Sequence, residues 1–152
     1  MRQKLVGKFS PLLLLLALVS GGINAHEGHG NHDPKFNGFV MMYVDLHFEV
    51  VLGERGGVRV YYSDEMRAEL PAAVVSGVHI DILPAGGAAQ SVAMSVSDGG
   101  DFWEGVGEAV TSSDTIVRVS FVFQEEPLVF ELPASIFPAF STPAADHSEH
   151  SA

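Results

Sequence analysis

The feature that most constrains the fold is a repeated alternation of apolar and polar residues between positions 38 and 133. Val78, Ile80 and Ile82, for example, are separated by polar residues, which places their side chains on one face of an extended chain. Short runs of this kind are interrupted by turn-forming stretches such as 54–57 (ERGG). No helical period of useful length competes with this pattern, so the region is predicted to be all-β.

Seven strands account for the alternating runs. They are predicted at 39–52, 58–62, 78–83, 90–96, 102–110, 115–123 and 128–132. Many short strands separated by turns favour an immunoglobulin-like two-sheet β-sandwich of about seven strands, with a small barrel as the alternative. Trp103 is a candidate core residue, although the glycines around it suggest that it is only half-buried.

Residues 1–25 have the organisation of a secretory signal peptide. Arg2, Lys4 and Lys8 precede an apolar run at 11–19, and small residues lead to a cleavage site after Ala25. The apolar run is too short to span a bilayer, which requires about 20 residues. Removing the segment takes three of the eight basic residues and none of the nineteen acidic ones, which changes the net charge from −11 to −14. We therefore expect an acidic periplasmic or secreted protein.

The two ends of the mature chain are predicted to be flexible tails. Residues 26–37 (HEGHGNHDPKFN) lack periodicity, and residues 134–152 are rich in alanine, serine and proline. An apolar patch at the start of the second tail is expected to pack on the domain; it comprises Ile136, Phe137 and Phe140. The tails carry five of the seven histidines, and these are the candidate metal ligands: His26, His29, His32, His147 and His150.

Imidazole is the commonest metal ligand in proteins and suits copper, zinc and nickel. If cleavage follows Ala25, His26 begins the mature chain, and its α-amine and ring can chelate one Cu(II) or Ni(II) ion. The same group of imidazoles can bind Zn(II) tetrahedrally. We expect a divalent transition metal as the cofactor, with copper favoured over zinc or nickel, and we expect its affinity to reside in the tails.

A weaker candidate site lies within the domain, where Asp45, His47 and Glu49 project from one face of the predicted strand 39–52. Successive side chains on such a face are about 6.5–7 Å apart. All three therefore cannot bind one ion without a bend, although two of them can bind with help from a neighbouring strand or a tail. The pattern favours a solvated strand face. Met66 lies in a polar connection and is the methionine to consider as a thioether ligand for Cu(I).

Several short motifs resemble a known family. The stretches 60–64 (VYYSD), 70–73 (LPAA) and 78–80 (VHI) resemble the core of YtkA-like domains, and 98–102 (DGGDF) with 117–119 (VRV) is similar to the second half of that family. The resemblance covers roughly residues 45–123 and implies a small exported β-sandwich near metal-transport machinery. The histidine-bearing mature N-terminus is similar, more loosely, to CopC-like periplasmic copper carriers. Neither resemblance supplies a catalytic residue.

Composition and motifs exclude several classes of function. The chain has no cysteine, which excludes disulfides, thiolate metal sites and a cysteine nucleophile. Its paired glycines match neither a phosphate loop nor a dinucleotide fingerprint, and five basic residues in the mature chain do not form a nucleic-acid surface. We expect a non-enzymatic metal-binding or metal-delivery protein whose partner is a membrane metal transporter or an oxidase assembly. The alternative is an accessory interaction module of such a system, in which the tails serve only for solubility.

Overall fold

The computed structural model describes residues 32–140 of the chain. Within them, ten β-strands and two short 3-10 helices follow one another. The strands are β1 (Phe39–Tyr43), β2 (Leu46–Leu52), β3 (Gly57–Ser63), β4 (Glu69–Leu70), β5 (Ser76–Leu83), β6 (Gln90–Val92), β7 (Ser95–Val96), β8 (Phe102–Val106), β9 (Ile116–Phe123) and β10 (Glu126–Pro133). The 3-10 helices are η1 (Ala72–Val74) and η2 (Ala134–Ile136). Neither helix of this part of the chain is long and apolar enough to cross a membrane.

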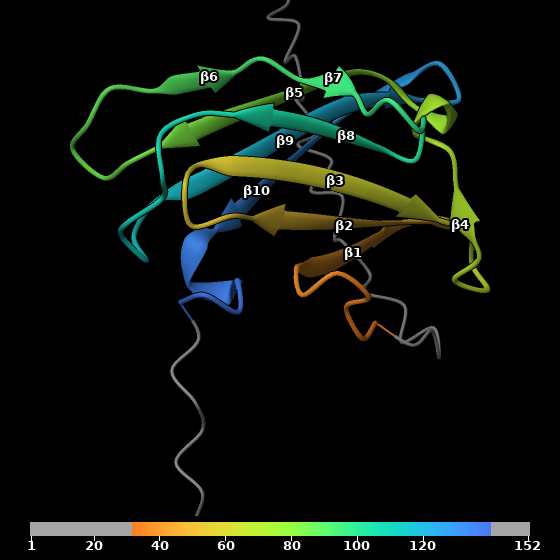
Figure 1. Cartoon of the computed structure of the whole chain (residues 1–152), viewed down its shortest axis with the longest axis horizontal. Coiled ribbons are helices and arrows are strands. Elements are labelled where there is room, and N and C mark those ends of the chain that lie inside the picture. The colour runs from red at the N-terminus through yellow and green to blue at the C-terminus, as the bar shows by residue number, and fades with distance from the viewer. Residues whose placement is uncertain (1–31, 141–152) are drawn as a thin grey trace, which may run out of the picture.

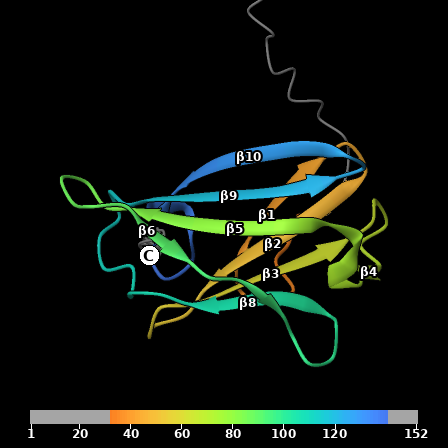
Figure 2. The same ribbon diagram turned by 90° about the horizontal axis from the view of Figure 1, so that it is seen from above.

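The strands form two sheets that face each other in a β-sandwich (Figures 1 and 2). The larger sheet has the order β1-β2-β3-β8-β7, with β4 paired to β3, and the smaller sheet has the order β10-β9-β5-β6. All of the strand pairs are antiparallel. The predicted fold class, an all-β two-sheet sandwich, is confirmed.

The predicted first strand, 39–52, was wrong as a single element, because the chain reverses at its middle. Val44 lies in a turn with φ of 53°, a conformation that β-branched residues rarely adopt, and its side chain is 67% exposed. After this turn, β2 pairs with β1 so that Leu46 lies opposite Tyr43. Opposed residues share a face of the sheet, so the turn shifts the alternation by one position. Tyr43 and Met41 therefore pack against the core, where the uninterrupted strand placed them outward.

Two other predicted elements also differ from the structure. The run 90–96 forms β6 in the smaller sheet and β7 in the larger one, so the chain crosses between sheets within it. The predicted strand 102–110 ends at Val106, and β8 lies between β3 and β7. The additional strand β4 comes from the segment 63–73, which was expected to be only a connection.

The core lies between the sheets and consists of the inward faces of the predicted alternating runs. Val78, Ile80 and Ile82 are buried as predicted, with at most 7% of each exposed. Phe48 and Phe121 are both fully buried and meet edge to face, with ring centroids 5.2 Å apart. Aromatic pairs in this arrangement contribute about 0.5–1.5 kcal/mol beyond the area that they bury. These contacts join the two sheets, because Phe48 lies on β2 and Phe121 on β9.

The segment after β10 returns to the sandwich. Phe137, which follows η2, is only 1% exposed, and its ring centroid lies 6.0 Å from that of Phe39. Ile136 and Phe140 also pack against the core, so the predicted apolar patch is confirmed.

The outer strands of the two sheets are short or contain proline. In the larger sheet, β1 has five residues and β7 has two. In the smaller sheet, β6 has three residues, and β10 carries Pro127 and Pro133. Proline lacks the backbone N–H that a further strand would need, so the longest of these edges lacks some of the donors required for pairing.

Candidate functional site

The segment that precedes β1 is held against the larger sheet by one carboxyl group. Glu49 on β2 is only 4% exposed, and its two oxygens accept hydrogen bonds from the backbone N–H groups of Lys35, Phe36 and Gly38, each at 2.8 Å. These three bonds explain why residues 32–37, which were expected to belong to a flexible tail, follow a defined path. Because both carboxyl oxygens of Glu49 already accept these hydrogen bonds, its role is to hold the backbone in place.

His47 lies two residues before Glu49 on the same face of β2, and the segment 32–38 runs over this face. Its side chain has no exposed surface, so the expectation of a solvated strand face was wrong. The ring Nδ1 lies 3.0 Å from the backbone carbonyl oxygen of Asp64. Because a carbonyl oxygen only accepts, Nδ1 carries the proton and donates it, and Nε2 of the neutral ring then presents a lone pair.

The electrostatics of this position keep the His47 ring neutral. Burial lowers the pKa of His47 from its ordinary value, and the hydrogen bond to Asp64 opposes that effect only in part. The positive charge of Arg67 lowers the pKa further. Within the described residues, the buried Nε2 atom has no hydrogen-bond partner. The site therefore holds an uncharged imidazole whose Nε2 atom is buried and receives no hydrogen bond from the described residues.

His32 lies beside the His47 ring. The ring centroids of His32 and His47 are 5.3 Å apart and their planes are inclined by 47°. Two imidazoles that bind one ion at nitrogen–metal distances of about 2.0–2.1 Å place their ring centres roughly 5–5.5 Å apart at tetrahedral or trigonal angles. The observed spacing is within this range. One tail histidine and one strand histidine, predicted as parts of separate sites, are thus brought together.

The other candidate ligands are not brought to this pair by the described residues. Asp45 lies in the exposed β1–β2 turn, and Met66 is 80% exposed in the β3–β4 connection. Four predicted ligands lie outside the described residues: His26, His29, His147 and His150. Between residues 32 and 140, no three histidine, aspartate or glutamate side chains form a group that can hold a metal ion.

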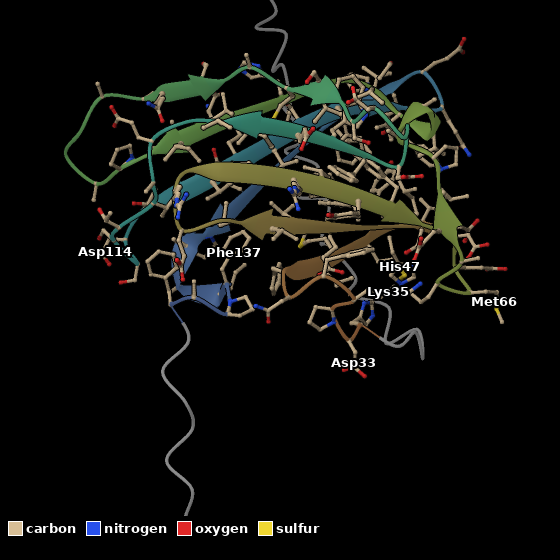
Figure 3. All side chains as sticks on the ribbon, viewed as in Figure 1. Asp33, Lys35, His47, Met66, Asp114 and Phe137 are labelled. Atoms are coloured by element: carbon tan, nitrogen blue, oxygen red, sulfur yellow. The ribbon has the colours of Figure 1, made fainter. Side chains whose placement is uncertain are left out.

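Figure 3 shows where the site lies in the molecule. Asp33, Lys35, His47 and Met66 lie in the right half of the view, Phe137 lies to their left, and Asp114 lies farther left still. Lys35 and Arg67 reinforce the region around His47, because the Lys35 Nζ donates to the Arg67 carbonyl oxygen and the Arg67 Nη2 donates to the Asp33 carbonyl oxygen at 3.0 Å. Residues 32–38, which we call the entry segment, are therefore tied both to β2 and to the β3–β4 connection.

Comparisons with protein-family models, curated proteins and solved structures find no match for this chain. The YtkA-like and CopC-like resemblances therefore stay predictions from short motifs. Any functional argument must rest on the geometry of the chain itself.

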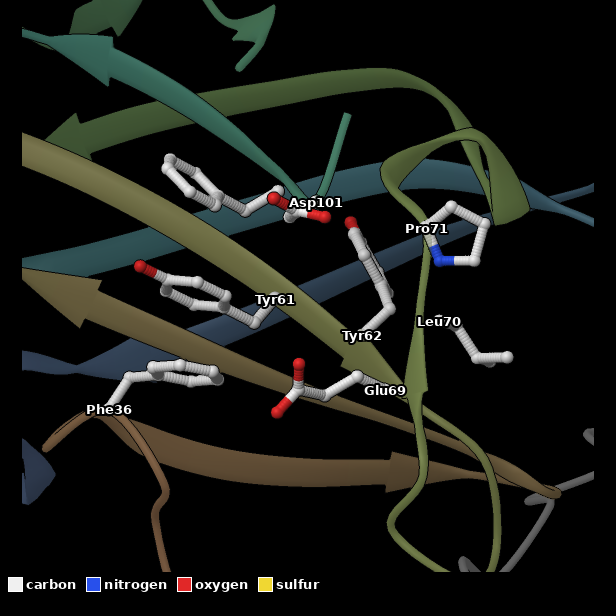
Figure 4. A pocket seen from close by; sticks show the side chains of 8 residues that line it. Phe36, Tyr61, Tyr62, Glu69, Leu70, Pro71 and Asp101 are labelled. Carbon is white, nitrogen blue, oxygen red and sulfur yellow. The ribbon is translucent and has the colours of Figure 1, made fainter. Parts of the chain in front are cut away.

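An aromatic hollow lies close to this site (Figure 4). It has a volume of about 480 Å³, and Phe36 and Tyr61 stack in it with ring centroids 3.7 Å apart. The carboxyl groups of Glu69 and Asp101 lie among the residues that line it. Its lining residues include no histidine or methionine, so this hollow is not a soft-metal site. Phe36, from the segment that precedes β1, is one of its rings and stacks on Tyr61 of β3.

Sequence reasoning missed three contributions to the His32–His47 site. The Asp64 carbonyl that orients His47 belongs to the backbone and leaves no trace in residue identity. The anchoring role of Glu49 depends on N–H groups 11 to 14 positions away. The hairpin at Val44 also changes which methionine lies next to His47, because the β1–β2 register places Met42 directly opposite it. A turn signal at 44–45 would have revealed this last relation, but the pair Val-Asp is not a typical turn sequence.

Proposed function

We propose that this protein is an exported transition-metal binding protein that holds its ion between His32 and His47, with copper favoured over zinc and nickel. One observation carries the proposal: the Nε2 atom of His47 is buried, uncharged and without a partner beside a second imidazole. A buried polar atom left unpaired costs about 1–3 kcal/mol, which a bound ion would offset.

The surroundings of His47 support a ligand role. Metal-binding histidines usually donate their second ring N–H to a carbonyl or carboxylate, which fixes the tautomer and the ring orientation. The bond from Nδ1 to the Asp64 carbonyl oxygen has this arrangement. The low pKa of His47 also favours binding, since a metal ion competes with protons for the imidazole.

The setting of the site is consistent with metal binding or delivery outside the cytoplasm. The signal-peptide pattern at 1–25 predicts export, and the acidic mature chain attracts cations. Further histidines at positions 26 and 29 lie within a few residues of His32 in the sequence. We propose that they collect metal ions for transfer to the His32–His47 pair, from which a membrane transporter or oxidase assembly would take them.

Titration calorimetry of the mature protein with Cu(II), Zn(II) and Ni(II) tests this proposal. His32→Ala and His47→Gln should each weaken the tightest site at least tenfold, because each removes one ligand. His79→Ala is the matched control, since His79 is exposed on the smaller sheet and pairs with Asp81. Circular dichroism establishes that each variant is folded.

If His32→Ala and His79→Ala bind metal as tightly as the unaltered protein, the proposal fails. The accessory-module alternative would then be preferred, with the sandwich making protein contacts and the tails serving only for solubility.

A further inference from the structure

We propose that the thioether of Met42 is the third ligand of the His32–His47 site and makes that site selective for Cu(I). This inference rests on the proposed function and specifies the oxidation state and the complete ligand set. It starts from the ladder between β1 and β2, in which Met42 is the residue directly opposite His47.

The register places the Met42 side chain on the same face as His47. Directly opposed residues in antiparallel strands have Cβ atoms about 4.5–5.5 Å apart and project to the same side of the sheet. The neighbours Met41 and Tyr43 pack against the core, so alternation directs Met42 to the opposite, outer face. Met42 is half-buried there, and an unbranched thioether is flexible enough to reach an ion bound at Nε2 of His47.

The ligand chemistry favours a soft, singly charged ion. Thioether sulfur selects Cu(I), and imidazole also binds copper, so two nitrogens and one sulfur form a suitable three-coordinate set. The carboxyl group of Glu49, on the same face of β2 as His47, is occupied by three backbone N–H groups. A hard divalent cation would therefore gain no carboxylate ligand from Glu49.

The positive charge of Arg67 acts in the same direction. Among the charged groups that act on His47, Arg67 has the largest effect, and it is positive. A positive neighbour repels a divalent ion about twice as strongly as a monovalent one at the same distance. The negative charge of Asp64 opposes this effect, and one of its side-chain oxygens also accepts the backbone N–H groups of Met66 and Ala68. The soft sulfur ligand, together with Arg67, therefore favours Cu(I) over Cu(II) and Zn(II) at this site.

The test compares methionine variants of the mature protein in anaerobic competition between the protein and a chromophoric Cu(I) chelator. Met42→Leu conserves volume and should lower Cu(I) affinity at least tenfold, while Zn(II) affinity changes less than twofold. Met66→Leu is the matched control, because Met66 lies near the same end of the molecule but is exposed. Its Cu(I) affinity should equal that of the unaltered protein.

A second measurement identifies the ligand directly. Ag(I) serves as a redox-inert substitute for Cu(I). Among the four methionines of the mature chain, Met42 should show the largest shift of its methyl NMR signal when Ag(I) binds. The signals of Met41 and Met94, which pack against the core, should move little.

The outcomes separate this inference from the proposed function. If Met42→Leu binds Cu(I) as tightly as Met66→Leu does, while His32→Ala still weakens metal binding, the assignment of the thioether as a ligand is overturned and the histidine pair is retained. If Met66→Leu alone lowers Cu(I) affinity, the sulfur ligand is Met66 and the assignment is again overturned. If His32→Ala has no effect on any metal, the underlying proposed function fails.

Discussion

Glu49 shows how a single side chain can determine the path of a segment. A carboxyl group accepting N–H bonds makes charge-assisted hydrogen bonds, which are roughly twice as strong as neutral ones. Here three such bonds converge on one buried group and fix the backbone of residues 35–38. His32 lies just before this anchored stretch, so its position beside His47 depends on Glu49 without any direct contact.

Glu49→Gln should therefore destabilise the fold by about 1–3 kcal/mol, because the amide NH₂ would face a backbone N–H and leave donors unpaired. Chemical denaturation followed by circular dichroism measures this change in the free energy of unfolding. Glu54→Gln is the control, since Glu54 is exposed in the β2–β3 turn. Metal affinity should fall in Glu49→Gln as the entry segment loosens. Equal stability of the two variants would show that the three bonds contribute little.

At the scale of strands, a polar row crosses the outer face of the smaller sheet. Asp81 on β5 lies opposite Ser91 on β6 and opposite Arg118 on β9, and Arg118 lies opposite Glu131 on β10. The Ser91 hydroxyl donates to Asp81 at 2.6 Å, and the Arg118 Nη2 donates to Glu131 at 2.7 Å. The row therefore links all four strands of this sheet through their side chains.

The hydrogen bond from Ser91, followed by the effects of His79 and Arg118, holds the pKa of Asp81 below its ordinary value. A carboxyl group whose folded pKa lies below its unfolded value of about 3.9 stabilises the fold above that pH. This contribution is lost as the pH falls through the lower folded pKa. Asp81→Asn should thus be less stable than the unaltered protein at pH 7.

This stability difference should shrink as the pH falls from about 5 to about 2, because the unaltered Asp81 becomes protonated. Urea denaturation across this range measures it. Asp114→Asn, at an exposed position before β9, is the matched control. A constant gap between Asp81→Asn and the unaltered protein would contradict the assignment.

Strand positions were predictable where turn-forming residues separate the strands in the sequence. The runs that became β3, β5, β9 and β10 were predicted within two residues of their observed bounds. The inward residues predicted for β5, Val78, Ile80 and Ile82, are buried. The β1–β2 hairpin was missed because Val44 adopts a positive φ, a turn conformation that is usually recognised in a sequence by glycine or asparagine. That error also hid the candidate site, since the pairing of Met42 with His47 exists only once the chain reverses.

For the whole molecule, the question is whether the two ends act on one ion. Both ends of the described chain emerge on the same side of the sandwich in Figure 1, separated along its long axis. Each tail has two or more histidines at local spacing in the sequence, and local chelation closes a smaller loop than a link between tails. The expectation that metal affinity resides in the tails stays a prediction, and our proposal adds a site that the first tail would share with β2.

The mature protein should therefore bind more than one metal ion per chain. Altering both His147 and His150 to alanine should remove only a weaker site and leave the affinity of the His32–His47 pair unchanged. Calorimetric stoichiometry of the unaltered and doubly altered proteins measures this. A stoichiometry of one that is abolished by altering either tail would instead show a single shared site.

The outer strands have a consequence for how the protein behaves in a crowded compartment. A long, regular sheet edge is a template on which identical chains add strands and grow into fibrils. The described edges are two, three or five residues long, or carry prolines that cannot donate, so each offers only a short ladder to another molecule. Mutual repulsion between acidic chains adds to this effect. The sandwich is thereby protected against self-templated aggregation at high local concentrations of the protein.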